Sequence, residues 1–369
     1  MAFPPVAVFI GGQMLEGYTA MTLSRSKEET TGTLDVDLFF SYVPAQPVLI
    51  DAAVAKDVSV YIGGQLAFVG TIDRRRGSGI KHGQLGSTQA EGSSGESQTT
   101  RSVSIGPNEY TVKLTARGKT KALVDSSHQH PTTNMLKTST REVIQKLIEP
   151  FNVGLEFIGT DVKLDKARLR DGAKVLDELR RMATENCYYI YETRDGRLRV
   201  TDDVGIGSGE PLILGQNILS FSAEQSEDQG RSEITVKGQR TPKDIWGEKA
   251  VLQNTVKIVQ DKWLQSYRPI TVQHYGDATE DNLERRARFE ANRRSSKSKT
   301  VTIDVFHVQS AGAPWDVGQL HYVEVPPEGI FDVFECTAIQ YTVTNNDTLK
   351  TTLTLSPPPA SGGSGASGL

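Results

Sequence analysis

The chain has 369 residues, 23% of them charged, and a formal net charge of −4. This length allows several domains with apolar cores, and the nearly balanced charge argues against a disordered chain and against a surface that binds nucleic acid along its whole length. The sequence contains neither a run of the roughly 18 apolar residues that span a membrane nor a basic-then-apolar signal at its start.

Residues 1–130 predict a small antiparallel β-barrel. Apolar and polar residues alternate, as over residues 33–38, so that one face of each strand would be buried. The Gly-Gly-Gln sequences at 11–13 and 63–65 are typical of tight hairpin turns, in which glycine supplies a positive φ. Residues 77–100 are rich in Gly, Ser, Gln and Thr, which predicts a flexible loop within this domain.

Residues 131–216 predict a compact α/β insert, because the apolar period changes here from two to that of a helix. Ser139 and Glu142 form a capping-box sequence at the start of a first helix. Pro150 would stop that helix.

A second helix of the insert is predicted from Asp171 to a C-cap at Asn186. Asp177 and Arg181 are four residues apart, in the order that favours an ion pair on a helix. A hairpin is expected over residues 188–200, across an Asp-Gly turn.

Strand patterning resumes in residues 217–240, which are expected to return to the barrel region. Residues 241–357 predict a second small β-barrel, with a helix at 279–296 whose narrow apolar stripe suggests a surface position. Residues 358–369 have the composition of a flexible tail. The expected fold class is therefore mainly β with an α+β insert: two small antiparallel β-barrels, a compact α/β domain and a surface helix.

Motifs for catalysis or cofactor binding are weak, and no catalytic, cofactor-binding or metal-ligating residue is predicted. Gly118-Lys119-Thr120 resembles the end of a phosphate-binding loop, but the required earlier glycine is Lys113. His128 and His130 could chelate a metal, yet no third ligand is near, so a polar linker is favoured. Cys187 and Cys336 are far apart and are expected to be free buried thiols. No cofactor is expected.

A basic cluster near the predicted helix is the main candidate for an interface. Between Arg285 and Lys299 seven basic residues face one acid, Glu290. A protein interface is favoured over phosphate binding, because aromatic residues are largely missing between the basic ones.

The candidate interface residues are Arg293, Arg294, Trp315, Leu349 and Leu353. Arg293 and Arg294 come from the basic cluster, and Trp315 is a candidate anchoring aromatic, with packing on its own barrel as the alternative. Leu349 and Leu353 lie in residues 349–355, which together with 33–38 are expected to be barrel edges that pair with neighbouring subunits.

The C-terminal sequence has a recognisable order: a charged helix, a strand, Pro314-Trp315 followed by Gly318-Gln319-Leu320, and strands ending in TTLTLSPP. This order resembles the baseplate hub proteins of contractile-tailed bacteriophages, a family that includes the late control D proteins and the hub portion of type VI secretion spikes. The resemblance extends over residues 6–357 and rests on order and spacing.

The resemblance implies a structural protein and not an enzyme. It implies a homotrimer whose subunits each contribute two barrels, giving a ring of six-fold appearance that joins the tail tube to the central spike. The implied partners are the tube protein, the spike protein, baseplate wedge proteins and the tape-measure protein; DNA would only pass through the channel. The implied location is the virion tail baseplate, after assembly in the host cytoplasm. No β-helix sequence follows residue 357, so a separate spike chain is expected.

Two other classes of function remain open. A cell-wall glycan-binding or peptidoglycan-degrading tail protein would need an acidic or aromatic cleft, whereas Trp246, Trp263 and Trp315 are widely spaced. A nucleic-acid-binding module could use the basic helix.

Overall fold

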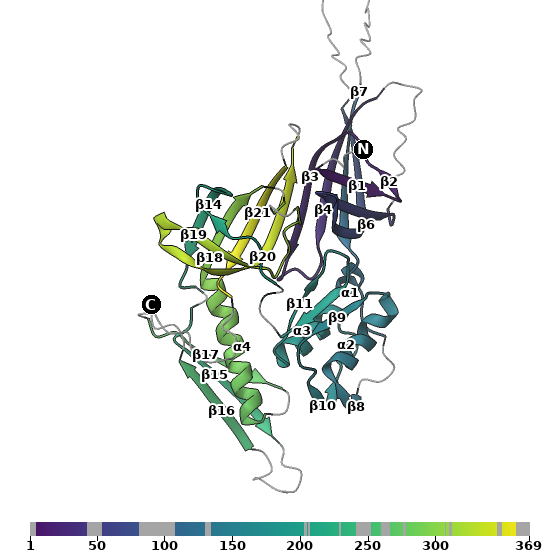
Figure 1. Cartoon of the computed structure of the whole chain (residues 1–369). Coiled ribbons are helices and arrows are strands. Elements are labelled where there is room, and N and C mark those ends of the chain that lie inside the picture. The colour runs from purple at the N-terminus through teal and green to yellow at the C-terminus, as the bar shows by residue number, and fades with distance from the viewer. Residues whose placement is uncertain are drawn as a thin grey trace, which may run out of the picture.

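The computed structural model describes residues 5–42, 54–80, 108–129, 134–202, 205, 207–228, 230–240, 252–259, 266–275, 278–306, 308–309, 312–344 and 349–358. In this part the chain is mainly β with few helices (Figure 1). Most of the predicted loop at 77–100, nearly all of the predicted tail, and His130, Trp246 and Trp263 lie outside the described residues.

The N-terminal strands are β1 (Val6–Ile10), β2 (Gln13–Met14), β3 (Tyr18–Ser26), β4 (Thr33–Tyr42), β5 (Asp57–Ile62), β6 (Gln65–Ile80) and β7 (Asn108–Gly118). Leu34, Val36 and Leu38 point into the core, as their alternation predicts. The β1–β2 and β5–β6 turns each contain two glycines with φ between 57° and 82°, so the predicted need for positive φ is confirmed.

The insert contains α1 (Lys121–Asp125), β8 (Asn134–Ser139), α2 (Thr140–Ile148), η1 (Glu149–Phe151), β9 (Leu155–Ile158), β10 (Lys163–Arg168), α3 (Val175–Glu185), β11 (Tyr189–Glu192) and β12 (Leu198–Thr201). Its helices pack on small sheets around a core of their own. The predicted cap is confirmed, because the Glu142 N–H donates to Ser139 Oγ at 3.2 Å.

Helix α3 differs from its prediction in two ways. It begins at Val175 and not near Asp171, because Gly172 has a φ of 72° and cannot belong to a helix. Arg181 does not pair with Asp177 but with the fully buried Glu178, at 2.6 Å, and with Glu185, at 3.1 Å. Arg181 pairs with Glu178 because a buried carboxylate is costly without a cation beside it, whereas an exposed carboxylate such as that of Asp177 is solvated by water. The expected C-cap at Asn186 is confirmed.

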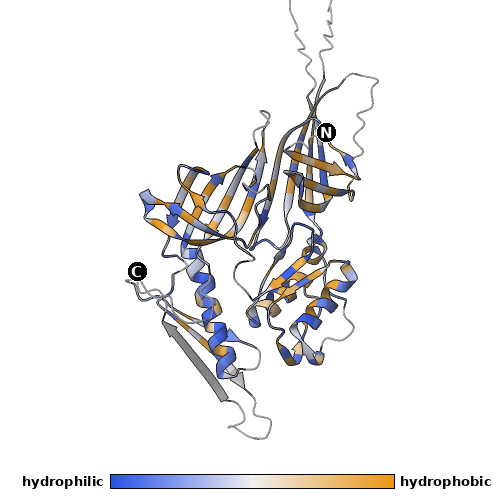
Figure 2. Ribbon diagram, in the orientation of Figure 1, coloured by the Kyte–Doolittle hydropathy of each residue, from blue (hydrophilic) through white to orange (hydrophobic). Residues whose placement is uncertain are grey.

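The C-terminal elements are β13 (Leu212–Ile213), β14 (Ile218–Gln225), β15 (Glu233–Arg240), β16 (Leu252–Val259), β17 (Pro269–His274), α4 (Glu280–Ser298), β18 (Lys299–Val305), β19 (Leu320–Val325), η3 (Pro326–Glu328), β20 (Ile330–Val343) and β21 (Leu349–Ser356). Strand β14 joins the large sheet, but β15 does not return to it and instead lies between β16 and β17 in a separate sheet. Helix α4 packs on this small sheet through Leu283, Ala287 and Ala291 (Figure 1). The rest of α4 is mostly hydrophilic (Figure 2), except that Phe289 packs on the Tyr189 ring of the insert, with ring centroids 4.9 Å apart.

The large sheet consists of two halves with the same topology. In the first half the pairs are β1–β5, β3–β4, β4–β7, β5–β6 and β6–β7. In the second half they are β13–β19, β14–β18, β18–β21, β19–β20 and β20–β21. Taken in chain order, six strands of each half therefore correspond, with two differences: β2, which pairs with β1, has no equivalent in the second half, and β13–β19 is parallel, whereas β1–β5 is antiparallel.

The two halves are joined within the chain by antiparallel pairing of β20 with β3, and one hydrophobic core extends through both. Among the described strands no barrel closes, so the two-barrel arrangement stays a prediction. The two expected edges are wrong: β4 lies between β3 and β7, and β21 lies between β18 and β20. Alternation of apolar and polar residues shows that one face is buried, and it cannot show whether a strand has neighbours on both sides.

Candidate interaction site

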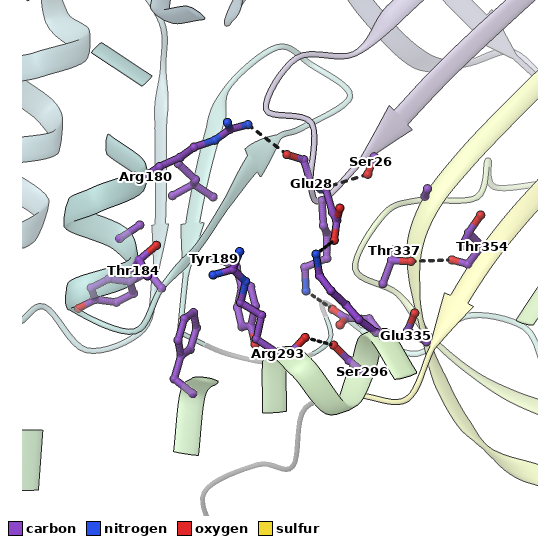
Figure 3. A pocket seen from close by; sticks show the side chains of 18 of the residues that line it. Ser26, Glu28, Arg180, Thr184, Tyr189, Arg293, Ser296, Glu335, Thr337 and Thr354 are labelled. Atoms are coloured by element: carbon purple, nitrogen blue, oxygen red, sulfur yellow. Dashed lines mark hydrogen bonds and ion pairs between the residues drawn. The ribbon is translucent and has the colours of Figure 1, made fainter. Parts of the chain in front are cut away.

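A cleft of about 700 Å³ lies where the large sheet, the insert and α4 meet. Its lining includes Glu28 beyond β3, Arg180 from α3, Tyr189 from β11, Arg293 from α4 and Glu335 from β20 (Figure 3). Segments far apart in the sequence therefore converge on one place.

The charged groups of this cleft mostly pair with one another. Lys27 Nζ lies 2.5 Å from Glu335 Oε1, with both side chains under 10% exposed, and also 4.5 Å from the centroid of the Tyr189 ring. Lys297 forms an ion pair with Glu28, and Arg180 donates to the Glu28 carbonyl at 3.2 Å. Such an arrangement connects three parts of the chain.

A second buried carboxylate, Glu192, fixes the insert to the large sheet. The backbone N–H groups of Gly32 and Thr120 donate to its two oxygens at 2.8 and 3.1 Å. Burial raises the pKa of the Glu192 carboxyl, while these two donors act to lower it. A Cβ at Gly118 would lie 1.9 Å from the carboxylate, so only glycine fits there.

The sequence analysis did not identify Glu192 as a structural residue, although the Gly118-Lys119-Thr120 run indicated a backbone that can bind an anion. The Gly-Lys-Thr run that resembled a phosphate loop does hold an anion through the Thr120 N–H, but that anion is a side chain of the same chain.

The basic cluster of α4 is largely neutralised within the chain. Arg286 and Arg294 both pair with the buried Glu290, at 2.7 and 3.4 Å, and Arg288 pairs with Glu284. Arg293 is exposed and has no ion-pair partner among the described residues, so it stays a candidate for contact with a partner.

Three of the predicted interface residues lie in or against the core of the large sheet. Trp315 is 3% exposed, and its indole N–H donates to the Phe306 carbonyl at 2.9 Å. Leu353 is completely buried, and Leu349 packs partly buried against the same core. The Trp315 and Leu353 side chains therefore offer no surface to another protein, which corrects the expectation for these two residues; the alternative for Trp315, packing on its own chain, is what the structure has.

His321 is fully buried beside Trp315, with ring centroids 5.4 Å apart, and its Nδ1 lies 2.9 Å from the Glu210 carbonyl oxygen. Burial lowers the pKa of His321, so the unfolded chain takes up a proton at this residue more readily than the folded chain does.

The free energy of unfolding is therefore expected to fall as pH drops below about 6.5, by about 1 kcal/mol between pH 7.5 and pH 5.5 from this residue. Urea unfolding of the wild type and of His321→Gln at both pH values measures the difference. Equal pH dependence in the two proteins would contradict the assignment.

The described residues contain no group of three or more His, Cys, Asp or Glu side chains arranged to hold a metal ion. His128 is buried, with Nε2 2.6 Å from the Arg170 carbonyl oxygen. Cys187 and Cys336 are free and buried, as expected. No helix in the described part is both long and apolar enough to cross a membrane.

Residues 120–202 match the family described as the second domain of gp44-like baseplate hub proteins. The chain is 23% identical to baseplate hub protein gp44 of Escherichia phage Mu over 301 residues, which cover 80% of this chain and 72% of that protein.

Two solved structures share the fold over nearly the whole length. The 43 kDa tail protein of prophage MuSo2 from Shewanella oneidensis is similar with a TM-score of 0.75 and 17% identity, over 96% of this chain and 98% of that one. A tail protein from Neisseria meningitidis MC58 has a TM-score of 0.70 and 19% identity, over 96% and 97% of the two chains. The hub-domain match and the Mu relative therefore show that the chain is similar to phage baseplate hub proteins, and the two solved structures show that it has the fold of these tail proteins.

Proposed function

We propose that three copies of this chain form the central ring of a contractile-tail baseplate. The observation that carries the proposal is the repeat within the large sheet: each chain contains two modules, β1–β7 and β13, β14 and β18–β21, whose strands pair in the same order apart from β2 and the direction of the β13–β19 pair. Three chains then supply six equivalent modules, so that one face can match a six-fold tail tube and the other a three-fold spike. Each module would close into a small barrel in the assembled ring.

In this role the protein joins the tail tube to the central spike and contacts the baseplate wedge proteins. The ring leaves a channel for the tape-measure protein and then for DNA. The protein would assemble in the host cytoplasm and remain in the virion tail baseplate. The division into residues 1–130, 131–216, 217–240, 241–357 and 358–369 would describe its domains with three changes: α1 packs in the core of the insert, β13 belongs to the large sheet, and β15, β16 and β17 form the small sheet beside α4.

The proposed role needs no catalysis. The alternative of a peptidoglycan-degrading protein would require carboxylates free to act on a glycan. In the described cleft, Glu335 is paired with Lys27 and Glu28 with Lys297, so this alternative gains no support.

Native mass spectrometry of the full chain is expected to give the mass of a trimer, because the two modules of each chain offer the contacts of a closed ring. Electron-microscopy class averages of the same sample should show six lobes around a central hole. A monomeric mass at micromolar concentration, alone and with the spike protein, would contradict the proposal.

Arg293→Glu is expected to weaken binding of the central spike protein several-fold at low salt, because an exposed cation at an interface steers and orients association. Arg288→Glu is the control, since Arg288 is exposed on the same helix but already paired with Glu284. Equal affinity of the Arg293 variant and the wild type, together with an unchanged oligomer mass, would remove α4 from the interface.

A further inference from the structure

The two equivalent modules of the chain are connected by a specific strand contact. Ala338–Val343 of β20 pairs antiparallel with Met21–Ser26 of β3, Ala338 opposite Ser26 and Val343 opposite Met21. In the first module the equivalent of β20 is β6, and in the second module the equivalent of β3 is β14. A ring of equivalent modules would repeat this contact between β6 of one copy and β14 of the next.

Irregularities in the strand register fix which residues correspond. Strand β20 has one between Cys336 and Ala338, and β6 has one between Ile72 and Arg74. Arg74 of β6 therefore corresponds to Ala338.

The other pair of strands is aligned in the same way. Strand β3 has an irregularity between Tyr18 and Ala20, and β14 has one between Ile218 and Ser220. Ser220 therefore corresponds to Ala20, and counting along the strand, Ser226 corresponds to Ser26.

Both edges required for such a contact are open among the described strands. Strand β6 pairs with β5 only as far as Thr71, so from Arg74 onward its one neighbour is β7. Strand β14 ends the large sheet, with β18 on one side. Arg74, Arg76 and Glu224 are exposed, as is every residue of β14 except Ile218 and Phe221.

We propose that β6 of one copy pairs antiparallel with β14 of a second copy, with Arg74 opposite Ser226, Arg76 opposite Glu224 and Ser78 opposite Ser222. This pairing deepens the proposed ring and rests on it. It would occupy two strand edges that otherwise expose unpaired backbone N–H and C=O groups.

The side chains favour this register. Arg76 and Glu224 carry opposite charges and meet directly across the two strands, where such pairs stabilise a sheet. Neither has an ion-pair partner in the described part of the chain. The acids Glu227 and Asp228 follow β14 in sequence, beside the end at which Arg74 and Arg75 would lie.

Cysteine cross-linking tests the register. The double variant Ser78→Cys/Ser222→Cys should oxidise to a covalent trimer on a non-reducing gel, because directly opposed residues of antiparallel strands have Cα separations of about 4.5–5.5 Å, within disulfide range. An equimolar mixture of the two single variants should give covalent dimers and no trimers, since each chain then has one reactive position. The native Cys187 and Cys336 are buried.

Ser78→Cys/Ala223→Cys is the matched control, because a neighbouring residue on a strand points to the opposite face of the sheet. It should form no covalent oligomer above background. A trimeric native mass without the Ser78–Ser222 cross-link, or with equal cross-linking of the control, would overturn this pairing and leave the proposed ring standing. A monomeric native mass would overturn both.

A charge exchange gives an independent measurement. Arg76→Glu and Glu224→Arg should each weaken association about fivefold per contact, because like charges would then oppose each other, and the double variant should restore the trimer. Additive losses in the double variant would overturn the Arg76–Glu224 contact.

Discussion

Replacing Lys27 with methionine is expected to lower the free energy of unfolding by about 3 kcal/mol. The Glu335 side chain is 4% exposed, and Lys27 is the partner that compensates its charge, with 2.5 Å between Nζ and Oε1. Removing one member of a buried ion pair leaves the other charge desolvated and unpaired, which costs far more than the pair itself contributes. The Lys27 ammonium group over the Tyr189 ring would be lost as well.

The double variant Lys27→Met/Glu335→Leu distinguishes this cause from loss of packing. With both charges removed, most of the lost stability should return, because an apolar pair of similar volume can replace a buried ion pair. Lys146→Met is the matched control: its pair with Glu142 is exposed at both ends and should contribute nothing measurable. Chemical denaturation of the four proteins at pH 7 gives the values. Equal losses in the single and double variants would contradict the argument.

The Lys27–Glu335 pair also shows where sequence reasoning reaches its limit. Features that depend on neighbouring residues were predicted correctly, such as the cap formed by Ser139, the glycine turns before β2 and β6, and the helix beginning after Thr279. Each of these features depends on residues that are only a few positions apart in the sequence. Lys27 and Glu335 are 308 residues apart in sequence, so nothing local could join them.

The arrangement of strands was predictable only in part. Alternation identified β14, β15 and β4 as strands, because one buried face produces it in any sheet. It carried no information on their neighbours, so β15 was assigned to the wrong sheet and β4 to an edge. The repeat of two modules became visible only through the pairings, since the equivalent strands share register irregularities and little sequence.

Of the candidate site, only the basic helix was predicted. Its ion pairs were not, and one of them, between Lys297 and Glu28, joins residues that are distant in sequence. The sequence count of basic residues over 285–299 left out Glu284 and Glu28, which pair with Arg288 and Lys297. In the described part of the chain, Arg285, Arg293 and Lys299 are the basic residues of this cluster without an ion-pair partner, and of these Arg285 and Arg293 are exposed.

Replacing Trp315 with alanine is expected to lower the free energy of unfolding by about 4 kcal/mol, because truncating a buried tryptophan leaves a large cavity. The Trp315 side chain is 3% exposed. Its indole N–H donates to the Phe306 carbonyl, and its own carbonyl accepts from the Tyr341 hydroxyl at 3.1 Å. The loss would therefore come from folding and not from assembly.

Trp315→Phe separates packing from hydrogen bonding, since it keeps an aromatic ring and removes the N–H donor. It should cost about 1–2 kcal/mol, from the smaller ring and the Phe306 carbonyl left without this donor. Denaturation of each variant, with native mass spectrometry at a temperature where it is folded, tests both parts. If Trp315→Ala had wild-type stability but lost its trimeric mass, Trp315 would be an interface anchor after all. An unchanged oligomer with a strongly lowered midpoint of unfolding would assign this tryptophan to the core that joins β19, β20 and the turn between β18 and β19.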